Sequence, residues 1–97
     1  MTTGNEQFRV MTITTKETDT DTNTVSTYRR EVYIVPPGKR FERFGGSRAG
    51  ILVTHQPSLI IRDSSAAGNR DSEYNVHDAK AWNAIRLTIM AGGVVTA

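Results

Sequence analysis

Apolar and polar positions alternate in two early segments of the chain, which predicts two β-strands. Residues 8–15 and 25–35 are rich in β-branched and aromatic side chains, the types that favour strands. In the second segment Tyr28 and Val32 share one face, and Tyr33 and Val35 share the other. Residues 16–23 between the segments contain no apolar side chain, so we expect a long turn or the solvated end of a β-hairpin.

The middle of the chain predicts shorter strands separated by turn residues. Pro36-Pro37-Gly38 ends the second strand, because proline cannot donate a ladder hydrogen bond. Residues 40–44 form a candidate short strand, and glycines 45 and 46 begin a loop. Residues 51–54 and 59–62 are expected to form a hairpin with Pro57 in its turn. The polar connection at 63–74 has a composition typical of a mobile loop.

Only one segment has the periodicity of a helix. Ala79, Trp82, Ile85 and Ile89 recur at helical spacing, and Asn75 is placed to cap the first turn. Asp78 would lie near the positive end of the helix. Gly92-Gly93 ends the segment and leaves a short tail at 94–97.

This order of elements predicts one α+β domain spanning residues 1–97, with a mobile loop near 63–74. We expect an antiparallel sheet of four to five strands with the C-terminal helix packed on one face, and Trp82 at the centre of that contact. Tyr33, Val35 and Met11 cannot all lie beneath one helix. Either the strand order places them at edges, or a second chain covers them.

Composition favours completion of the fold by another chain. Of the 97 residues, 37% are hydrophobic, somewhat below the usual globular range, which indicates a thin core or an intermolecular one. Cysteine is absent, so disulfides and thiolate metal sites are excluded. The sequence shows neither a signal peptide nor an apolar stretch long enough to cross a bilayer. We therefore expect no membrane association and a cytoplasmic location, or a place in a virion.

Candidate metal, phosphate and catalytic motifs are all incomplete. Asp19-Thr-Asp21-Thr-Asn23 matches the first ligands of a calcium loop, but Thr24 replaces the turn glycine and Arg30 replaces the closing glutamate. The glycine-rich stretch 45–50 is followed by strand-forming residues rather than by a phosphate-binding helix. The two histidines have no metal-ligand spacing, and no nucleophile has a positioned base. We expect no metal, no cofactor and no enzymatic activity.

Positive charge is concentrated in the middle of the chain, although the net charge is only +2. Six basic residues between positions 29 and 48 are opposed there only by Glu31 and Glu42, and aromatic residues are interleaved with them. Tyr28 falls on the same strand face as Arg30, and Tyr33 on the same face as Arg29. Because charge and apolar surface are not segregated, this pattern favours an interface. The candidate partner-binding residues are Tyr28, Arg29, Arg30, Tyr33, Lys39, Arg40, Arg43 and Arg48.

Two functional hypotheses follow from the sequence. The first is a non-enzymatic protein-interaction or assembly module, a small structural or accessory subunit of the kind that viral genomes encode. It would bind a partner or itself through a sheet face or edge, with Tyr33, Val35, Val94 and Val95 in contact. The alternative is a nucleic-acid-binding domain in which the arginines contact phosphates and Tyr28 or Phe44 stacks on bases.

Overall fold

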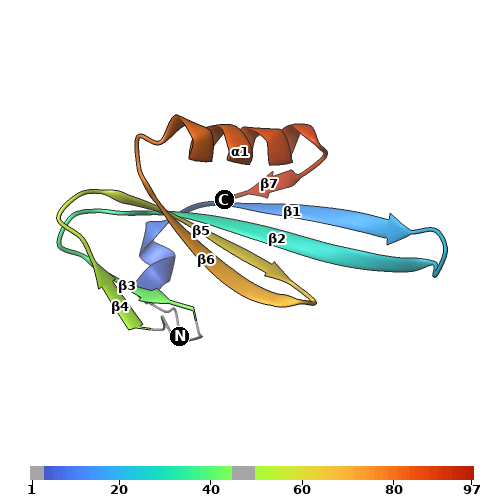
Figure 1. Ribbon diagram of the computed structural model, residues 1–97, viewed down its shortest axis with the longest axis horizontal. Coiled ribbons are helices and arrows are strands. Elements are labelled where there is room, and N and C mark those ends of the chain that lie inside the picture. The colour runs from blue at the N-terminus through green and yellow to red at the C-terminus, as the bar shows by residue number, and fades with distance from the viewer. Residues whose placement is uncertain (1–3, 45–49) are drawn as a thin grey trace.

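The computed structural model describes residues 4–44 and 50–97 and shows an α+β fold (Figure 1). A five-stranded antiparallel sheet has the strand order β6-β5-β2-β1-β7, and a separate two-stranded sheet pairs β3 with β4. The helix covers one face of the larger sheet, as the sequence predicts. The elements are η1 (Gly4–Phe8, a 3₁₀ helix), β1 (Arg9–Asp19), β2 (Thr24–Val35), β3 (Arg40–Arg43), β4 (Gly50–Val53), β5 (Ser58–Ser65), β6 (Gly68–Asn75), α1 (Ala79–Met90) and β7 (Val94–Thr96).

Strands β1 and β2 form a long hairpin that extends beyond the rest of the sheet (Figure 1). Pairing of β2 with β5 begins at Arg29, and pairing of β1 with β7 ends at Thr14. Residues 15–28, the hairpin arm, are therefore paired only with each other. At the tip, the Asp19 carboxylate accepts hydrogen bonds from the backbone amides of Asp21 and Thr22. This confirms the hairpin alternative for the polar segment.

The larger sheet separates two apolar clusters. The cluster on the helix side is centred on Ile13, Val32 and Ile85, which are at most 2% exposed. The opposite cluster contains Tyr33 and Phe41, whose rings meet edge to face with centroids 5.1 Å apart. Completing the two clusters are Leu59, Ile61 and Ala81 on the helix side, and Phe8, Val35 and Ile60 on the other.

The second face of the sheet needs no other chain to cover Tyr33 and Val35. Both residues are buried, together with Phe41 of β3 and Phe8 of η1. Met11 packs instead against the cluster on the helix side. The expectation that these side chains lie at edges or beneath a second chain is therefore wrong, because the smaller sheet and η1 fold back over that face.

The predicted hairpin of residues 51–54 and 59–62 is also wrong. Strand β4 pairs with β3, with Phe41 opposite Leu52, whereas β5 pairs with β2 and β6. The connection around Pro57 carries the chain from one sheet to the other instead of turning it back. The amide of Gly38 donates to the carbonyl of Thr54 at 2.9 Å, which holds the two connections between the sheets together.

Residues 63–74 form paired strands rather than a loop. Strand β5 continues to Ser65, and β6 runs antiparallel to it from Gly68, where φ is +124°. The polar residues of this hairpin are accommodated because Arg62 lies directly opposite Asp71 and forms an ion pair with it. Opposite charges facing each other across a strand pair stabilise the sheet without apolar contact.

The helix begins one turn later than predicted. Asp78 caps α1 by accepting hydrogen bonds from the amides of Lys80 and Ala81, whereas the Asn75 side chain accepts from the amide of His77 before the helix starts. Trp82 is not the centre of the contact with the sheet. It is half-buried beside Ala81 and Ile85, which are 3% and 2% exposed, and its indole N–H donates to the carbonyl of Val76.

The glycine pair ends the helix as predicted and also starts a strand. Gly92 has φ +107°, a conformation that side chains disfavour. At Gly93 a Cβ atom would lie 2.5 Å from Ile13 Cγ2 and 2.8 Å from the carbonyl oxygen of Thr88, so only glycine fits between the helix and β1. This close approach places residues 94–96 beside β1 as β7.

Candidate functional site

The predicted basic cluster is divided among three places in the structure. Alternation along β2 places Arg30 with Tyr28 on the helix side and Arg29 with Tyr33 on the opposite side, as predicted. Lys39, Arg40 and Arg43 lie in β3 and the connection before it, at the end of the molecule away from the hairpin arm (Figure 1). Arg48 and most of the glycine-rich stretch lie outside the described residues.

Arg30 is used inside the fold. Its Nε lies 2.8 Å from Asp63 Oδ1, and its two terminal nitrogens donate to the hydroxyls of Thr88 and Tyr28, each at 2.9 Å. Burial and the neighbouring Asp63 raise the pKa of Tyr28 above its ordinary value. Burial alone would lower the pKa of Arg30, but hydrogen bonding to Asp63 and the charge of that carboxylate raise it. Arg30 thus ties α1 to β2 and β5.

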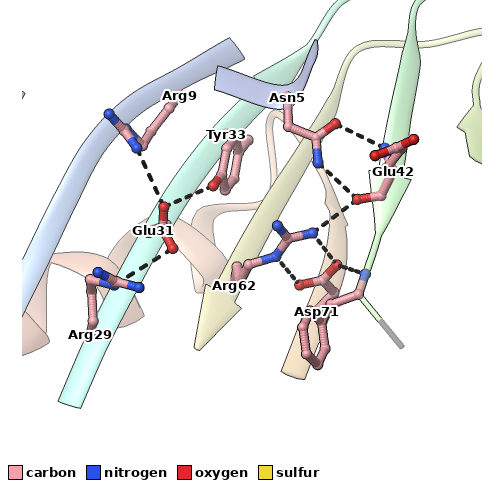
Figure 2. A network of polar contacts seen from close by, with 9 residues as sticks. Asn5, Arg9, Arg29, Glu31, Tyr33, Glu42, Arg62 and Asp71 are labelled. Atoms are coloured by element: carbon pink, nitrogen blue, oxygen red, sulfur yellow. Dashed lines mark hydrogen bonds and ion pairs between the residues drawn. The ribbon is translucent and has the colours of Figure 1, made fainter. Parts of the chain in front are cut away.

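Glu31 neutralises the positive charge on the other face of β2. Figure 2 shows its carboxylate between Arg9, Arg29 and the Tyr33 hydroxyl, at 3.5, 3.7 and 2.9 Å. Burial, together with the hydrogen bond to Glu31, raises the pKa of Tyr33 to about 12. Arg29 has the longest of these contacts and a side chain that is 56% exposed, so it remains the most accessible member of this group.

Arg62, which the sequence analysis did not single out, is the main link between the two sheets. It forms a two-point ion pair with Asp71, with N–O distances of 2.8 and 2.9 Å, and donates to the carbonyl of Glu42 in β3 (Figure 2). Its guanidinium lies over three aromatic rings at 5.4 to 5.9 Å, and the hydrogen bonds outweigh burial to raise its pKa. The rings belong to Tyr33, Phe41 and Phe44.

Two further sets of hydrogen bonds hold β3 and the residue after it against the larger sheet and η1. The Asp71 carboxylate accepts from the amide of Phe44 at 2.7 Å, and the Asn5 side chain both donates to and accepts from the Glu42 backbone. Arg62 and Asp71 could have been found only by recognising the hairpin that places them opposite each other. The predicted basic cluster therefore contributes Arg30 to a set of ion-paired residues inside the fold. We define this internal arginine network as Arg30, Arg62, Glu31, Asp63 and Asp71.

Three basic residues of the predicted cluster lie outside this network and form no ion pair among the described residues. Lys39 and Arg40 are exposed, and neither forms an ion pair among the described residues. Arg43 is half-buried, and its Nε finds no hydrogen-bond partner within residues 4–44 and 50–97. Phe44 nearby is 48% exposed. Among the described residues, the predicted basic surface is thus reduced to Arg29 and a small patch at one end of the molecule.

The most exposed apolar region lies at the other end of the sequence. It comprises the last turns of α1 and strand β7, with Met90 74% and Val94 63% exposed. Residues 87–97 contain no charged side chain. Among the described strands, β7 pairs only with β1, so its outer backbone edge is open. We define the C-terminal surface as Leu87, Ile89, Met90, Val94 and Val95.

Shallow hollows also occur among the described residues. One is lined by residues 54–58 and 73–75 and includes His55; another lies between the base of the hairpin arm and the end of α1. Within the described ranges, no three histidine, cysteine or acidic side chains gather as metal ligands. In the same part of the chain no helix has the length and apolar character needed to cross a membrane. The absence of a cofactor and of enzymatic activity stays a prediction.

Neither the family models nor the curated proteins and solved structures compared with this chain give a match.

Proposed function

We propose that this α+β domain is a non-enzymatic assembly module that associates with other protein chains, foremost copies of itself, through the C-terminal surface and the open edge of β7. The observation that carries the proposal is the joint position of these features. Within residues 4–44 and 50–97, half of the ten exposed large hydrophobic residues lie at positions 87–95, on one helix end and the edge strand that follows it.

The free energy gained by removing apolar side chains from water favours coverage of this surface by another chain. Burying a Leu, Ile, Met or Val side chain fully is favourable by about 1.5 to 3 kcal/mol, and five such side chains are wholly or partly in water here. An open strand edge adds unpaired backbone groups that another chain can satisfy. Apolar side chains beside a free edge are the combination that strand addition between proteins uses.

Part of the predicted contact set supports this location. Val94 and Val95, two of the four apolar contact residues expected from the sequence, are 63% and 45% exposed. Tyr33 and Val35, the other two, are only 3% and 1% exposed beneath β3. The candidate interface is thus a sheet edge together with a helix end, and the sheet face beneath the smaller sheet is excluded from it.

The mass of the protein in solution tests the proposal. Light scattering should show an oligomer whose proportion rises with protein concentration and which persists at high salt, since apolar contacts are not screened. Val94→Asp places a charge in the surface and should yield the monomer. Val25→Asp in the hairpin arm is the matched control, because Val25 is 62% exposed, almost the same as Val94, and its replacement should leave the oligomer intact.

A wild-type monomer at every concentration up to the millimolar range would contradict self-association. Equal loss of the oligomer in both variants would place the contact elsewhere, or show that added negative charge alone disperses the protein. The melting temperature of Val94→Asp should be close to that of the wild type measured at a concentration low enough to dissociate the oligomer. Agreement between the two would confirm that the variant domain remains folded.

Nucleic-acid binding is the second candidate, supported by Lys39, Arg40 and the exposed ring of Phe44. It is less favoured because Arg30 and Arg62 are held by Asp63 and Asp71. Absorbance at 260 and 280 nm across the eluted peak tests it directly. Bound nucleic acid that dissociates steeply as salt rises, and that Lys39→Glu with Arg40→Glu abolishes, would favour this alternative over assembly.

A further inference from the structure

We infer that the partner at the C-terminal surface is a second copy of this chain, and that β7 pairs antiparallel with its equivalent about a two-fold axis at Val95. This rests on the proposed assembly function and specifies its geometry. Five strands from each copy would then form one continuous ten-stranded sheet. In such an isologous contact, each copy contributes the same surface.

The two edges of the larger sheet differ in charge. The edge formed by β6 exposes charged side chains, Arg70 and Glu73, and charges along an edge are a common protection against strand addition. The edge formed by β7 has the sequence Val-Val-Thr and no charged residue. Strand addition is therefore expected at β7 rather than at β6.

The distribution of charge also favours a second copy as the partner. Each copy carries a formal net charge of +2, so two copies repel each other at long range. They can meet with least repulsion where neither presents a charge, and residues 87–97 are such a region. An acidic partner would be drawn instead toward Lys39 and Arg40 at the far end of the molecule. An uncharged apolar surface fits another uncharged apolar surface, which a second copy supplies.

The register of β7 against its equivalent is also favourable. In a two-fold antiparallel pair centred on Val95, that residue faces its own equivalent, and Val94 faces Thr96 of the second copy. Val95 lies opposite Ile13 across the pair with β1, so it shares the helix side of the sheet with that buried residue. Val94 and Thr96 lie on the other side. Every cross-strand pair is then between β-branched side chains, which pack favourably across strands.

The shape of the molecule agrees with this arrangement. The hairpin arm extends along the direction of β1 beyond the region paired with β7 (Figure 1). Since β7 and its equivalent run in opposite directions, the two arms would project from opposite ends of the dimer and would not collide. The contact of three residues per strand is short, so the exposed side chains of α1, Leu87 and Met90, are expected to contribute to the same interface.

Single cysteine variants test the register, because the natural chain contains no cysteine. Residues directly opposite in antiparallel strands have Cα atoms about 4.5 to 5.5 Å apart, within the range that a disulfide spans. Under oxidised glutathione, Val95→Cys should form a covalent dimer at low protein concentration. Val94→Cys and Thr96→Cys should each cross-link slowly alone and form a mixed disulfide rapidly when combined.

Val25→Cys in the hairpin arm controls for random collision, since its side chain is at least as exposed. A cross-linking rate for Val95→Cys at least tenfold above this control supports the inferred pairing; equal rates overturn it. An oligomer by light scattering without rapid Val95 cross-linking would overturn the β7 pairing and leave the assembly function standing. A monomer by light scattering would overturn both.

Amide hydrogen exchange of the unmodified protein provides an independent measurement that does not depend on the folding of a variant. Pairing about Val95 predicts that the amides of β7 exchange more slowly as concentration rises, whereas those of the β6 edge do not change. Protection confined to β6 would place strand addition at the opposite edge and would contradict the inference.

Discussion

The internal arginine network and the C-terminal surface differ in how far the fold satisfies their side chains. The network contains charged side chains, but each has a close partner within the fold, such as Arg62 with Asp71 at 2.8 Å. The C-terminal surface contains apolar side chains of the kind found in cores, but Met90 is 74% exposed. The charged side chains of the network pair with one another or with neighbours inside the fold, whereas the apolar side chains of the C-terminal surface remain exposed.

Residue type alone does not show which side chains are free to contact a partner. A cluster of arginines is available for a partner only if acidic residues elsewhere do not pair with them, and Asp63, which pairs with Arg30, lies 33 residues further along the chain. Conversely, a valine counts as core only if another element covers it. Burial and pairing, rather than composition, decide which surface is free.

Arg62→Ala should produce the largest change, because it breaks the network at the link between the sheets. Removing one member of a largely buried ion pair costs about 3 to 5 kcal/mol, and Asp71, whose side chain is 9% exposed, would lose its partner. Urea unfolding measures the loss. Arg40→Ala, at an exposed position with no ion pair among the described residues, should change stability by less than about 0.5 kcal/mol. Similar losses in both variants would contradict the comparison.

High pH should weaken the same region through Tyr33. Its pKa of about 12 in the fold exceeds the ordinary value of 10.0, so the folded protein binds this proton more tightly than the unfolded chain does. The resulting stabilisation is complete below pH 10 and is lost as pH rises through 12. The difference corresponds to about 2 to 3 kcal/mol.

Urea unfolding of the wild type and of Tyr33→Phe at pH 9 and pH 11.5 isolates this effect. The wild type should lose more stability than the variant over that interval, because phenylalanine has no proton to release. Parallel losses in the two proteins would show that other groups, such as lysines, cause the alkaline destabilisation.

The helix cap should have a smaller effect. Asp78→Ala removes the acceptor for two amides of the first turn and should cost about 1 kcal/mol. Asn75→Ala removes the bond to the amide of His77 outside the helix and should cost less. Thermal unfolding of both variants ranks them, and a larger loss for Asn75→Ala would restore the cap position expected from the sequence.

The features that could be predicted from the sequence are those fixed by local periodicity. Alternation with period two assigns Tyr28 and Tyr33 to opposite faces, and helical spacing together with Gly92-Gly93 locates the helix and its end. Strand pairing depends on distant partners, so β4 could not be assigned to β3 from its own residues. The polar strands at 63–74 were missed because their stability comes from the pairs Arg30–Asp63 and Arg62–Asp71, which exist only after folding.

The candidate site was predictable to a similar extent. Val94 and Val95 could be proposed because an apolar tail after two glycines has no evident place in a core. Tyr33 and Val35 have the same apolar character, and nothing in their own sequence shows that β3 covers them. The open edge of β7 likewise depends on the strand order, which requires the whole chain.

Leu87→Ser should have the smallest effect on stability and the clearest effect on assembly. Leu87 is 55% exposed, so its replacement in an isolated copy should change the free energy of unfolding by no more than about 0.5 kcal/mol. In the oligomer it loses apolar contact, and light scattering should show dissociation at concentrations where the wild type remains associated. Ile85→Ser, at a buried position of the same helix, should instead unfold the domain. If Leu87→Ser lowers stability as Ile85→Ser does, Leu87 belongs to the core, and the contrast between the two regions fails at that residue.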